Sequence, residues 1–309
     1  MTNLFTFNSD GMKKHIIQII LSTLFFFLVD YISDNVMSKG IDSFYGLNQH
    51  SKLLIVGHSH LMLATDKERI EYELHTAVSK YTREGVNVAD KKIMIRQYLE
   101  SDCSDSLRIC LYGVDLFTFT GQGLSQNSYQ LFYPFMDNPS ISNYIKAHAT
   151  PTDYWLRKLV RTTRYNDDGI KNASIRGWMN DWSNRKNGMV DTETYKQKLQ
   201  NGNERHIGMQ QELIEDFKET VKMMTDRGIK VILVNTPTLD LLNGYEPERF
   251  KMITKWFKDF AQNSPFVEYW DFNPQYASKY ELFHDCLHLN AKGQEIITTE
   301  IIRKLRKEL

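Results

Sequence analysis

The segment LLIVGHSH (residues 53–60) places a serine directly behind a short apolar run. Four consecutive apolar residues, Leu53 to Val56, are followed by Gly57, which predicts a strand buried on both faces. Strands of this kind belong to parallel sheets that are covered by helices on either side. Ser59 is therefore expected where the first strand of such a sheet meets a helix.

Four further short strands are expected, and helical patterns lie between them. These strands occupy residues 77–81, 107–112, 229–234 and 266–270. Asn87 can cap a helix between the second and third strands, and apolar residues spaced by three and four predict a helix over 209–224. Pro247 suits the first turn of another helix, and Asn290 can cap the last one. The alternation predicts an α/β protein with a three-layer, doubly wound fold of about five parallel strands.

A second stretch, FHDCLHLNAKG (residues 283–293), places an acid and an imidazole three residues apart, just before the last helix. Loops at the carboxyl ends of parallel strands share one edge of the sheet, so Asp285 and His288 are expected to meet Ser59 there. A serine hydroxyl is a weak nucleophile until a base takes its proton. His288 would be that base, and Asp285 would hold the imidazole in the productive tautomer.

These two segments together resemble the SGNH/GDSL hydrolase superfamily. Gly57-His58-Ser59 stands where the family often has Gly-Asp-Ser, and the final D-x-x-H block is matched by Asp285 and His288. The trailing H-L-N-x-x-G, which ends at Gly293, is common in the family. The resemblance covers most of residues 51–309 apart from an insert. It implies an SGNH, flavodoxin-like fold and a serine esterase or O-acyltransferase that needs no metal or organic cofactor.

The resemblance also implies where the oxyanion would be bound. The backbone N–H groups of Ser59 and Gly85 would donate to it, Gly85 being the glycine of the second block. The third block usually contains an asparagine, but Asp115 occupies its position, and an ionised carboxylate cannot donate. Asn87 or a residue of the insert would then substitute. A similar loss of the asparagine is found in a membrane-anchored branch that includes the D-alanyl transfer protein DltD and the alginate acetylation proteins.

Residues 15–33 are expected to anchor the chain in a membrane. The run from His15 to Val29 carries no charged side chain except a titratable histidine, and two lysines precede it, which is the charge order of an N-in, C-out span. Residues 1–14 would be a cytoplasmic tail and residues 34–50 a polar tether. The run gives about 22 Å of helix against about 30 Å of hydrocarbon, so extension toward Met37 would help. A cleavable signal peptide and a buried helix are the alternatives, although no A-x-A-like cleavage site follows.

Residues 118–207 break the alternation and are too long for a simple connection, which predicts an inserted lid. Gly121 and Gly123 open this insert, and three prolines and many aromatic residues follow. The candidates for binding a carbohydrate or an acyl group are Trp155, Trp178 and Trp182. Alternatively, the aromatic residues form a small core of the insert itself.

Composition excludes some partners and cofactors. The 38 basic and 38 acidic side chains balance, which gives no reason to expect a nucleic acid. Three cysteines are too few for a disulfide framework, and Cys286 lies inside the proposed site. His58 and His60 flank Ser59, and with Asp285, His284 and His288 nearby a zinc cluster is conceivable. The superfamily that these segments resemble needs no metal, so none is expected.

Two functions of different classes follow. In the first, the chain is a membrane-anchored enzyme whose domain lies in the bacterial periplasm or on the cell surface and acts on an acylated glycan or another envelope polymer. In the second, it is a catalytically silent scaffold of the same fold that assists a membrane-bound O-acyltransferase. A soluble lipase-like enzyme is a third interpretation. Hydrolysis and transfer share one acyl-enzyme, so the sequence does not separate them.

Overall fold

The computed structural model describes residues 9–121, 127–202 and 204–308. Most of the expected cytoplasmic tail and residues 122–126 of the expected insert, which include Gly123, lie outside these ranges. The strands are β1 (Leu53–Gly57), β2 (Val78–Thr82), β3 (Ile109–Val114), β4 (Lys230–Asn235) and β5 (Val267–Asp271). They form one parallel sheet in the order β2-β1-β3-β4-β5. The predicted doubly wound, flavodoxin-like α/β fold is confirmed.

The sheet reverses its winding between β1 and β3. The chain moves outward from β1 to β2 and then returns to β3, which pairs with β1 from Leu53↔Ile109 to Val56↔Tyr112. At such a switch point the loops after the two central strands turn to opposite faces and leave a crevice at the carboxyl edge. Ser59 follows β1 and Asp115 follows β3, so both lie at this crevice.

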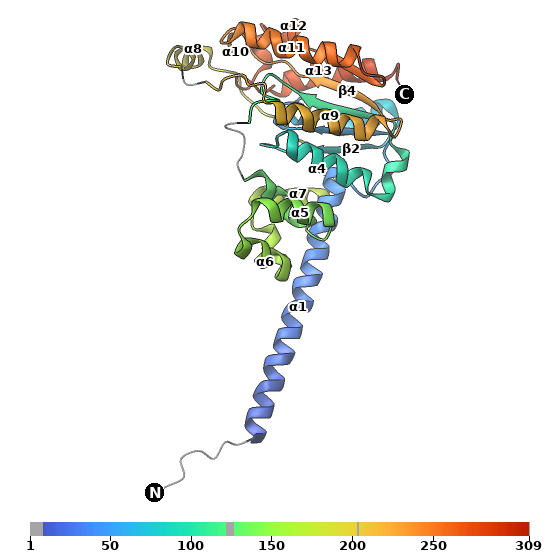
Figure 1. Cartoon of the computed structure of the whole chain (residues 1–309), viewed down its shortest axis with the longest axis vertical. Helices are drawn as coiled ribbons and strands as arrows, with labels where there is room; N and C mark the ends of the chain where they lie inside the picture. Colours follow the sequence, from blue (N-terminus) through green and yellow to red (C-terminus); the bar gives the residue numbers. More distant parts are fainter. Residues whose placement is uncertain (1–8, 122–126, 203, 309) are drawn as a thin grey trace.

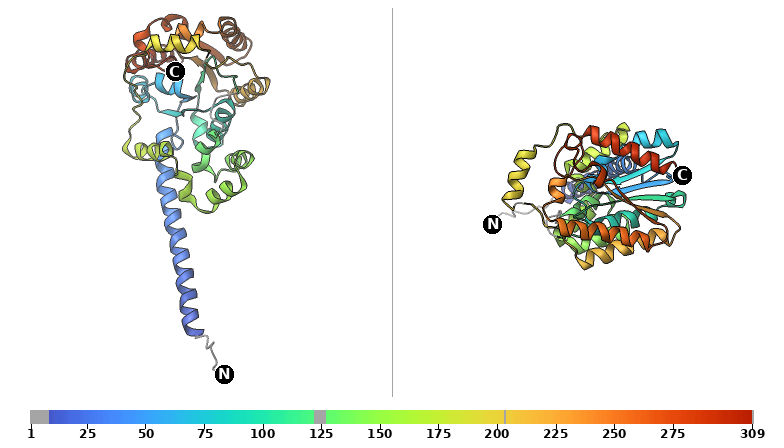
Figure 2. Two further views of the ribbon diagram at one scale, coloured as in Figure 1. Left: turned by 90° about the vertical axis from the view of Figure 1, so that its left-hand side faces the viewer. Right: turned by 90° about the horizontal axis from the view of Figure 1, so that it is seen from above.

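Helices cover both faces of the sheet, and Figure 2 shows α13 and α11 on opposite sides of it. One face carries α2 (Ser59–Ala64), α3 (Lys67–Leu74) and α13 (Ala291–Leu305). The other carries α4 (Val88–Leu99), α9 (Gln211–Thr225) and α11 (Pro247–Gln262). The shorter helices are α5 (Pro139–His148), α6 (Pro151–Leu159), α7 (Asp168–Met179), α8 (Thr192–Gln200), α10 (Asp240–Asn243) and α12 (Asn273–Tyr276). The 3₁₀ turns are η1 (Asp102–Ser106), η2 (Ser128–Phe135), η3 (Arg161–Tyr165) and η4 (Tyr280–Leu282).

The predicted caps begin the helices that flank the crevice. The Asn87 side chain accepts from the Asp90 backbone N–H at 3.0 Å, and the Asp90 carboxylate accepts in turn from the Asn87 backbone N–H. The two bonds make a capping box at α4. Asn290 accepts from the Gly293 N–H at 3.1 Å and begins α13. These bonds fix where the loops before α4 and α13 end.

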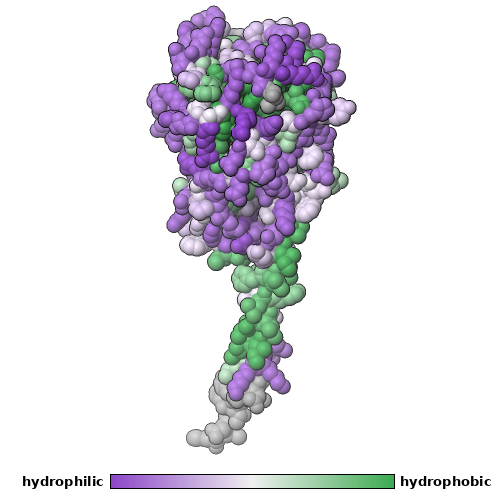
Figure 3. All heavy atoms as spheres, turned by 90° about the vertical axis from the view of Figure 1, so that its right-hand side faces the viewer, coloured by the Kyte–Doolittle hydropathy of each residue, from purple (hydrophilic) through white to green (hydrophobic). Residues whose placement is uncertain are grey.

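The N-terminal segment is one long helix, α1 (Ser9–Tyr45), that projects from the domain (Figure 1). Its most apolar stretch has a mean hydropathy of 2.0, and 6% of that stretch is buried, which a core helix would not allow. Figure 3 shows this stretch as an apolar column below a polar head. The segment predicted as a tether, residues 34–50, is helical as far as Tyr45. α1 therefore passes from the exposed stretch into the domain without a break.

Part of the predicted lid clasps this helix instead of covering the site. Asp30 of α1 accepts from the Arg161 and Thr162 backbone N–H groups at 2.8 Å each. Asp34 accepts from the Tyr165 hydroxyl at 2.8 Å and forms an ion pair with Arg161. Both acids are buried against η3, which explains how they fit a helix that is otherwise apolar. The buried aromatic residues of this part of the insert belong to the same core as the sheet, and Phe135 packs against Tyr81 of β2: Phe132, Tyr133, Phe135 and Tyr154.

Helices α1 and α7 touch through their backbones at Gly40 and Gly177. A methyl group added at Gly177 would lie 1.7 Å from the Gly40 carbonyl oxygen, and one added at Gly40 would lie 2.3 Å from the Ser174 carbonyl oxygen. Ser174 Oγ donates to the Met37 carbonyl at 2.8 Å, which fixes the register of the two helices. Gly40, which belongs to the segment predicted as a polar tether, is therefore a contact of this crossing.

We predict that Gly177→Ala destabilises the head. Alanine favours a helix by about 1 kcal/mol over glycine, but overpacking against backbone costs typically 1–3 kcal/mol, so the clash outweighs the propensity. Gly169→Ala, in the same helix, is the matched control because a methyl group added there would meet one side-chain atom, Asp167 Oδ1 at 3.0 Å, and no backbone atom of another described element within 4 Å. The melting temperatures of the two variants should shift in opposite directions from that of the wild type. Equal melting temperatures would contradict the close crossing.

Candidate active site

The structure brings Ser59, His288 and Asp285 together in one hydrogen-bonded row. Ser59 Oγ lies 2.8 Å from His288 Nε2, and His288 Nδ1 lies 2.8 Å from Asp285 Oδ2. Because an ionised carboxylate can only accept, Nδ1 carries the ring proton and Nε2 is left to accept from the serine hydroxyl. This is the arrangement that the sequence predicts for a nucleophile, its base and the residue that orients the base.

Small residues place Ser59 at the crevice. Ser59 is the first residue of α2, immediately after β1. Leu61 of α2 packs over Gly57 and Gly113, where an added methyl group would come within 3.0 Å of Leu61 Cβ at either glycine. Glycine at both positions lets α2 sit directly on the ends of β1 and β3. The serine hydroxyl therefore projects toward the neighbouring loop instead of into the sheet.

The loop that carries Asp285 and His288 is held by its own backbone. Asp285 Oδ1 accepts from the N–H groups of Leu287 and His288 at 2.8 and 2.9 Å. Partial burial pulls the pKa of Asp285 upward, but the hydrogen bond and charge of His288 and the two N–H groups outweigh it and hold the pKa to about 2. The carboxylate is therefore ionised at any pH at which the protein would be assayed.

Three cavities flank His288, and the third, of about 230 Å³, is lined by Ser59, Glu84 and Lys186 among others. The first, of about 190 Å³, is lined on the Ser59 side by Gly85, Asn87 and Asp115 among others. The second, of about 370 Å³, is mostly apolar and lies against α8, with Tyr195 and Leu287 in its wall. Several parts of the insert approach the site: α8 lines the second cavity, Arg205 lines the first, and the segment before α8 is held by the Val190 N–H, which donates to the Phe283 carbonyl at 3.0 Å.

The two predicted oxyanion residues of the second loop lie beside Ser59. Gly85 adopts φ +74°, a left-handed conformation that favours glycine. Asn87 uses Oδ1 for its cap, so its Nδ2 is the part of the amide that remains to donate into the first cavity. The structure thus places both groups at the cavity without fixing what they bind.

Asp115 does not donate to an oxyanion. It is buried, and its Oδ1 accepts from the Phe117 N–H and the Thr118 hydroxyl at 2.9 and 3.0 Å. Burial pulls its pKa upward, but the charges of His58, His60 and Lys91 outweigh burial and lower the pKa to about 2.

The other carboxylate oxygen of Asp115 faces His58 and His60, a grouping that sequence reasoning missed. The available clue was that β1 and β3 are neighbours in this fold, so the loops after them meet.

The three tryptophans predicted to bind substrate are not at the site. Trp178 Nε1 donates to the Val36 carbonyl at 2.9 Å, and Trp182 Nε1 donates to the Phe44 carbonyl at 3.0 Å, so both hold α1. Trp155 lies on α6 and is 54% exposed. Among the described residues that line the three cavities beside His288, none is a tryptophan. This prediction is wrong because the aromatic residues pack on a helix that the sequence did not extend so far.

Cys286 and His284, which the sequence places in the same loop, have other surroundings. Burial raises the pKa of the Cys286 thiol to about 11, so it stays protonated and unreactive near neutral pH. His284 Nδ1 lies 2.7 Å from the Asn187 carbonyl oxygen, which turns this ring toward the insert. Neither side chain joins the row formed by Ser59, His288 and Asp285.

Comparison with known proteins gives matches among solved structures. No protein-family model matches the chain, and no curated protein matches it. A proposed acylhydrolase from Bacteroides fragilis is 10% identical, with 83% of this chain and 86% of that one covered and a TM-score of 0.41. The catalytic domain of peptidoglycan O-acetyltransferase A from Streptococcus pneumoniae is 10% identical, with 84% and 95% covered and a TM-score of 0.39. The lipase Lip_vut3 from a goat rumen metagenome is also 10% identical, with 81% and 94% covered and a TM-score of 0.36.

The sheet and the crevice together define the class of this protein. It is a doubly wound α/β protein that carries a hydrogen-bonded serine, histidine and aspartate at the carboxyl edge of its parallel sheet.

Proposed function

We propose that the chain is a serine esterase or O-acyltransferase of the SGNH type. The observation that carries this proposal is the unbroken row from Ser59 Oγ through His288 to Asp285, with 2.8 Å at each step. A serine that merely caps a helix needs no imidazole at its hydroxyl, and a histidine that merely packs needs no ionised partner. The row therefore supports catalysis over a purely structural role.

The chemistry follows from the proton positions. His288 Nε2 takes the hydroxyl proton as Ser59 Oγ attacks the carbonyl carbon of an ester, and Asp285 stabilises the imidazolium that forms. The tetrahedral intermediate collapses as His288 returns the proton to the leaving alcohol, which leaves an acyl group on Ser59. Water or a sugar hydroxyl, deprotonated by His288, then attacks the acyl-enzyme and frees Ser59.

The oxyanion of that intermediate needs donors that are already in place. Ser59, Gly85 and Asn87, which would offer two backbone N–H groups and the side-chain Nδ2, line the cavity beside the nucleophile. We assign the oxyanion to these three. Asn87 then supplies the amide that the residue after β3 does not, because Asp115 is ionised.

The first and second cavities differ in polarity, which supports binding of the two sides of an ester in different cavities. The larger, apolar cavity suits the acyl chain, and the smaller one, with more polar walls, suits the alcohol side of the ester. We propose an O-acylated glycan or another acylated envelope polymer as the substrate, from the resemblance described above. A membrane-bound O-acyltransferase is the corresponding partner.

The test is covalent labelling of the full chain in detergent with a fluorophosphonate probe, followed by peptide mapping. We expect one adduct, on the peptide that contains Ser59, together with turnover of p-nitrophenyl acetate. A folded protein that is neither labelled nor active would favour the silent scaffold. Asp115 at the expected asparagine position is the observation behind that second function.

We propose that α1 anchors the protein in a membrane, with the head outside the cytoplasm. Its apolar side chains from Ile16 to Val29 are mostly exposed, and the acids that follow are satisfied by η3. α6 lies beside the emerging helix (Figure 1). It exposes Trp155 and Leu159, which suit a membrane–water interface. This gives Trp155 a role that does not involve substrate.

We predict that the chain resists extraction by alkaline carbonate and that Leu21→Arg combined with Phe25→Arg releases it. Each arginine at the centre of a span costs about 2.5–3.5 kcal/mol on insertion scales. Both side chains are at least 60% exposed, so the head should keep its melting temperature and esterase activity. Tyr72→Arg, at an exposed position on α3, is the control. Wild-type protein recovered in the soluble fraction would contradict the anchor.

A further inference from the structure

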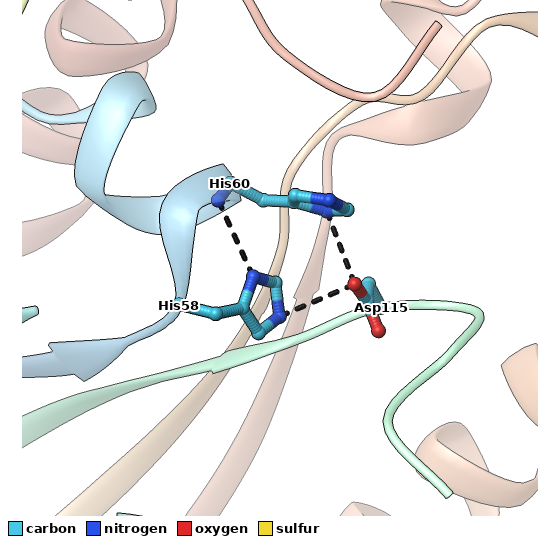
Figure 4. Close-up of side chains that lie close together, drawn as sticks. All are labelled: His58, His60 and Asp115. Atoms are coloured by element: carbon cyan, nitrogen blue, oxygen red, sulfur yellow. Dashed lines mark hydrogen bonds and ion pairs between the residues drawn. The ribbon is translucent and has the colours of Figure 1, made fainter. Parts of the chain in front are cut away.

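His58, His60 and Asp115 form a compact cluster next to Ser59 (Figure 4). His58 Nε2 lies 3.2 Å and His60 Nδ1 lies 3.1 Å from the same carboxylate oxygen, Asp115 Oδ2. The two rings are nearly perpendicular, with centroids 4.5 Å apart. One donor atom from each residue lies within 4.8 Å of the other two. Imidazole nitrogen and carboxylate oxygen are donors that first-row transition metals bind.

The two nitrogens are close to the oxygen but are not aimed at it. Among the described residues, neither His58 Nε2 nor His60 Nδ1 forms a hydrogen bond, and both atoms are shut off from solvent. Burying a ring nitrogen without an aligned partner is costly, so the arrangement needs an explanation. A shared ligand would explain this arrangement. If the lone pairs of both nitrogens and of the oxygen are directed at one position between the three atoms, neither nitrogen is directed at the oxygen itself.

The two nitrogen–oxygen distances fit a metal site. With bonds of about 2.1 Å to an ion, donor atoms 3.1–3.2 Å apart subtend about 95–100° at it. This angle lies between the octahedral and tetrahedral values. The two nitrogens lie within 4.8 Å of each other, so a small movement of the rings brings all three donors onto one divalent cation.

The carboxylate is also oriented as a metal ligand would be. Asp115 Oδ1 is fixed by the Phe117 N–H and the Thr118 hydroxyl, so Oδ2 faces the two rings. His58 Nδ1 accepts a long bond of 3.3 Å from the His60 N–H. Coordination through Nε2 moves the ring proton to Nδ1 and gives up this contact, a small loss beside a metal–nitrogen bond.

We propose that His58 Nε2, His60 Nδ1 and Asp115 Oδ2 bind a divalent first-row transition metal ion of the Zn²⁺ kind. Three protein ligands leave at least one coordination position open, as in catalytic sites and unlike closed structural ones. All three residues line the cavity that contains Ser59, so the open position takes an oxygen atom of the molecule bound there. The inference goes beyond the proposed esterase, which uses no metal, and departs from the expectation drawn from the sequence.

Metal content of the full chain tests this site. The protein, purified in detergent and stripped with dipicolinate, is titrated with Zn²⁺ and, separately, with Co²⁺, whose visible absorption reports nitrogen ligands. His58→Gln and His60→Asn keep an amide N–H near the original ring nitrogen but remove the ligand lone pair, and Asp115→Asn removes the charge. Ser59→Ala and Cys286→Ser are the matched controls, one beside the cluster and one a thiol outside it.

We expect about one bound ion in the wild type and in both controls. Each cluster variant should bind at least 10-fold more weakly and lose the rise in melting temperature that Zn²⁺ gives the wild type. Cluster variants that bind as the wild type does, or a wild type without stoichiometric metal and without the Co²⁺ absorption, would overturn the site. If a variant does not fold, the Co²⁺ spectrum of the wild type decides.

The outcome is separable from that of the proposed function. Fluorophosphonate labelling of Ser59 in the metal-free protein, with no ion ever bound, rejects the metal site and leaves the esterase standing. Stoichiometric metal with no labelling rejects the esterase and keeps the site.

Discussion

Replacing Ser59 by alanine should lower ester turnover by at least about 10⁴-fold and abolish covalent labelling. His288 Nε2 lies 2.8 Å from the Ser59 hydroxyl oxygen. The thiol of Cys286, two positions before His288, cannot replace this hydroxyl. Burial raises the pKa of Cys286 to about 11, so that group is not a nucleophile near neutral pH. Ser59 is half-buried at the start of a short helix, and the change to alanine leaves its backbone in place. The melting temperature should therefore stay close to that of the wild type.

Cys286→Ser is the matched control for this loss. It alters a side chain in the wall of the second cavity but none of the three residues in the hydrogen-bonded row. We expect its turnover to stay within a few-fold of the wild type and its labelling to be unchanged. Loss of labelling in Cys286→Ser, with retention in Ser59→Ala, would assign the nucleophile to the cysteine instead.

Replacing Asp285 by asparagine should lower turnover by about 10²–10⁴-fold without unfolding the protein. The amide keeps an oxygen for the N–H groups of Leu287 and His288, so the loop holds its shape. It no longer stabilises the imidazolium, and it admits the tautomer with the proton on Nε2, which cannot accept from Ser59. The rate of fluorophosphonate labelling should fall by a similar factor.

The pH profile separates this role from a general effect of charge. Because the pKa of Asp285 is lowered to about 2, its carboxylate stays ionised as the pH falls, and the ratio of variant to wild-type turnover should be constant above about pH 4. Asp168→Asn is the control, since that carboxylate is almost fully exposed and pairs with Lys171 on the surface. A ratio that approaches one within that range would mean that Asp285 does not act as an ionised partner.

Much of the fold follows from the sequence because its signals are local. β1, β3 and β4 are short, mostly apolar runs that end at or just before a glycine or a polar residue, and parallel strands buried on both faces have this composition. The caps at Asn87 and Asn290 need three residues of context. Asp285 and His288 are three positions apart, and their fold places them beside the strand that precedes Ser59. The serine, histidine and aspartate could thus be proposed together.

The rest depends on contacts between distant segments. Asp30 and Asp34 end an apolar run when they are viewed along the chain, yet their partners lie in η3, more than a hundred positions away. Gly40 belongs to a segment predicted as a tether, and only the folded structure shows that it packs against Gly177. The grouping of His58 and His60 with Asp115 depends on β1 and β3 being neighbours in the sheet. No local pattern contains these pairings.

The continuity of α1 has a consequence for how substrate arrives. From Asp30 to Tyr45 the helix rises by about 24 Å, and this part of it packs against the insert. The head is therefore joined rigidly to α1, with no flexible linker between them. If α1 anchors the chain as proposed, the opening beside Ser59 is held at one height above the bilayer. That height would suit a long polymer or an acyl donor that extends out of the lipid, and would not suit an ester among the lipid tails.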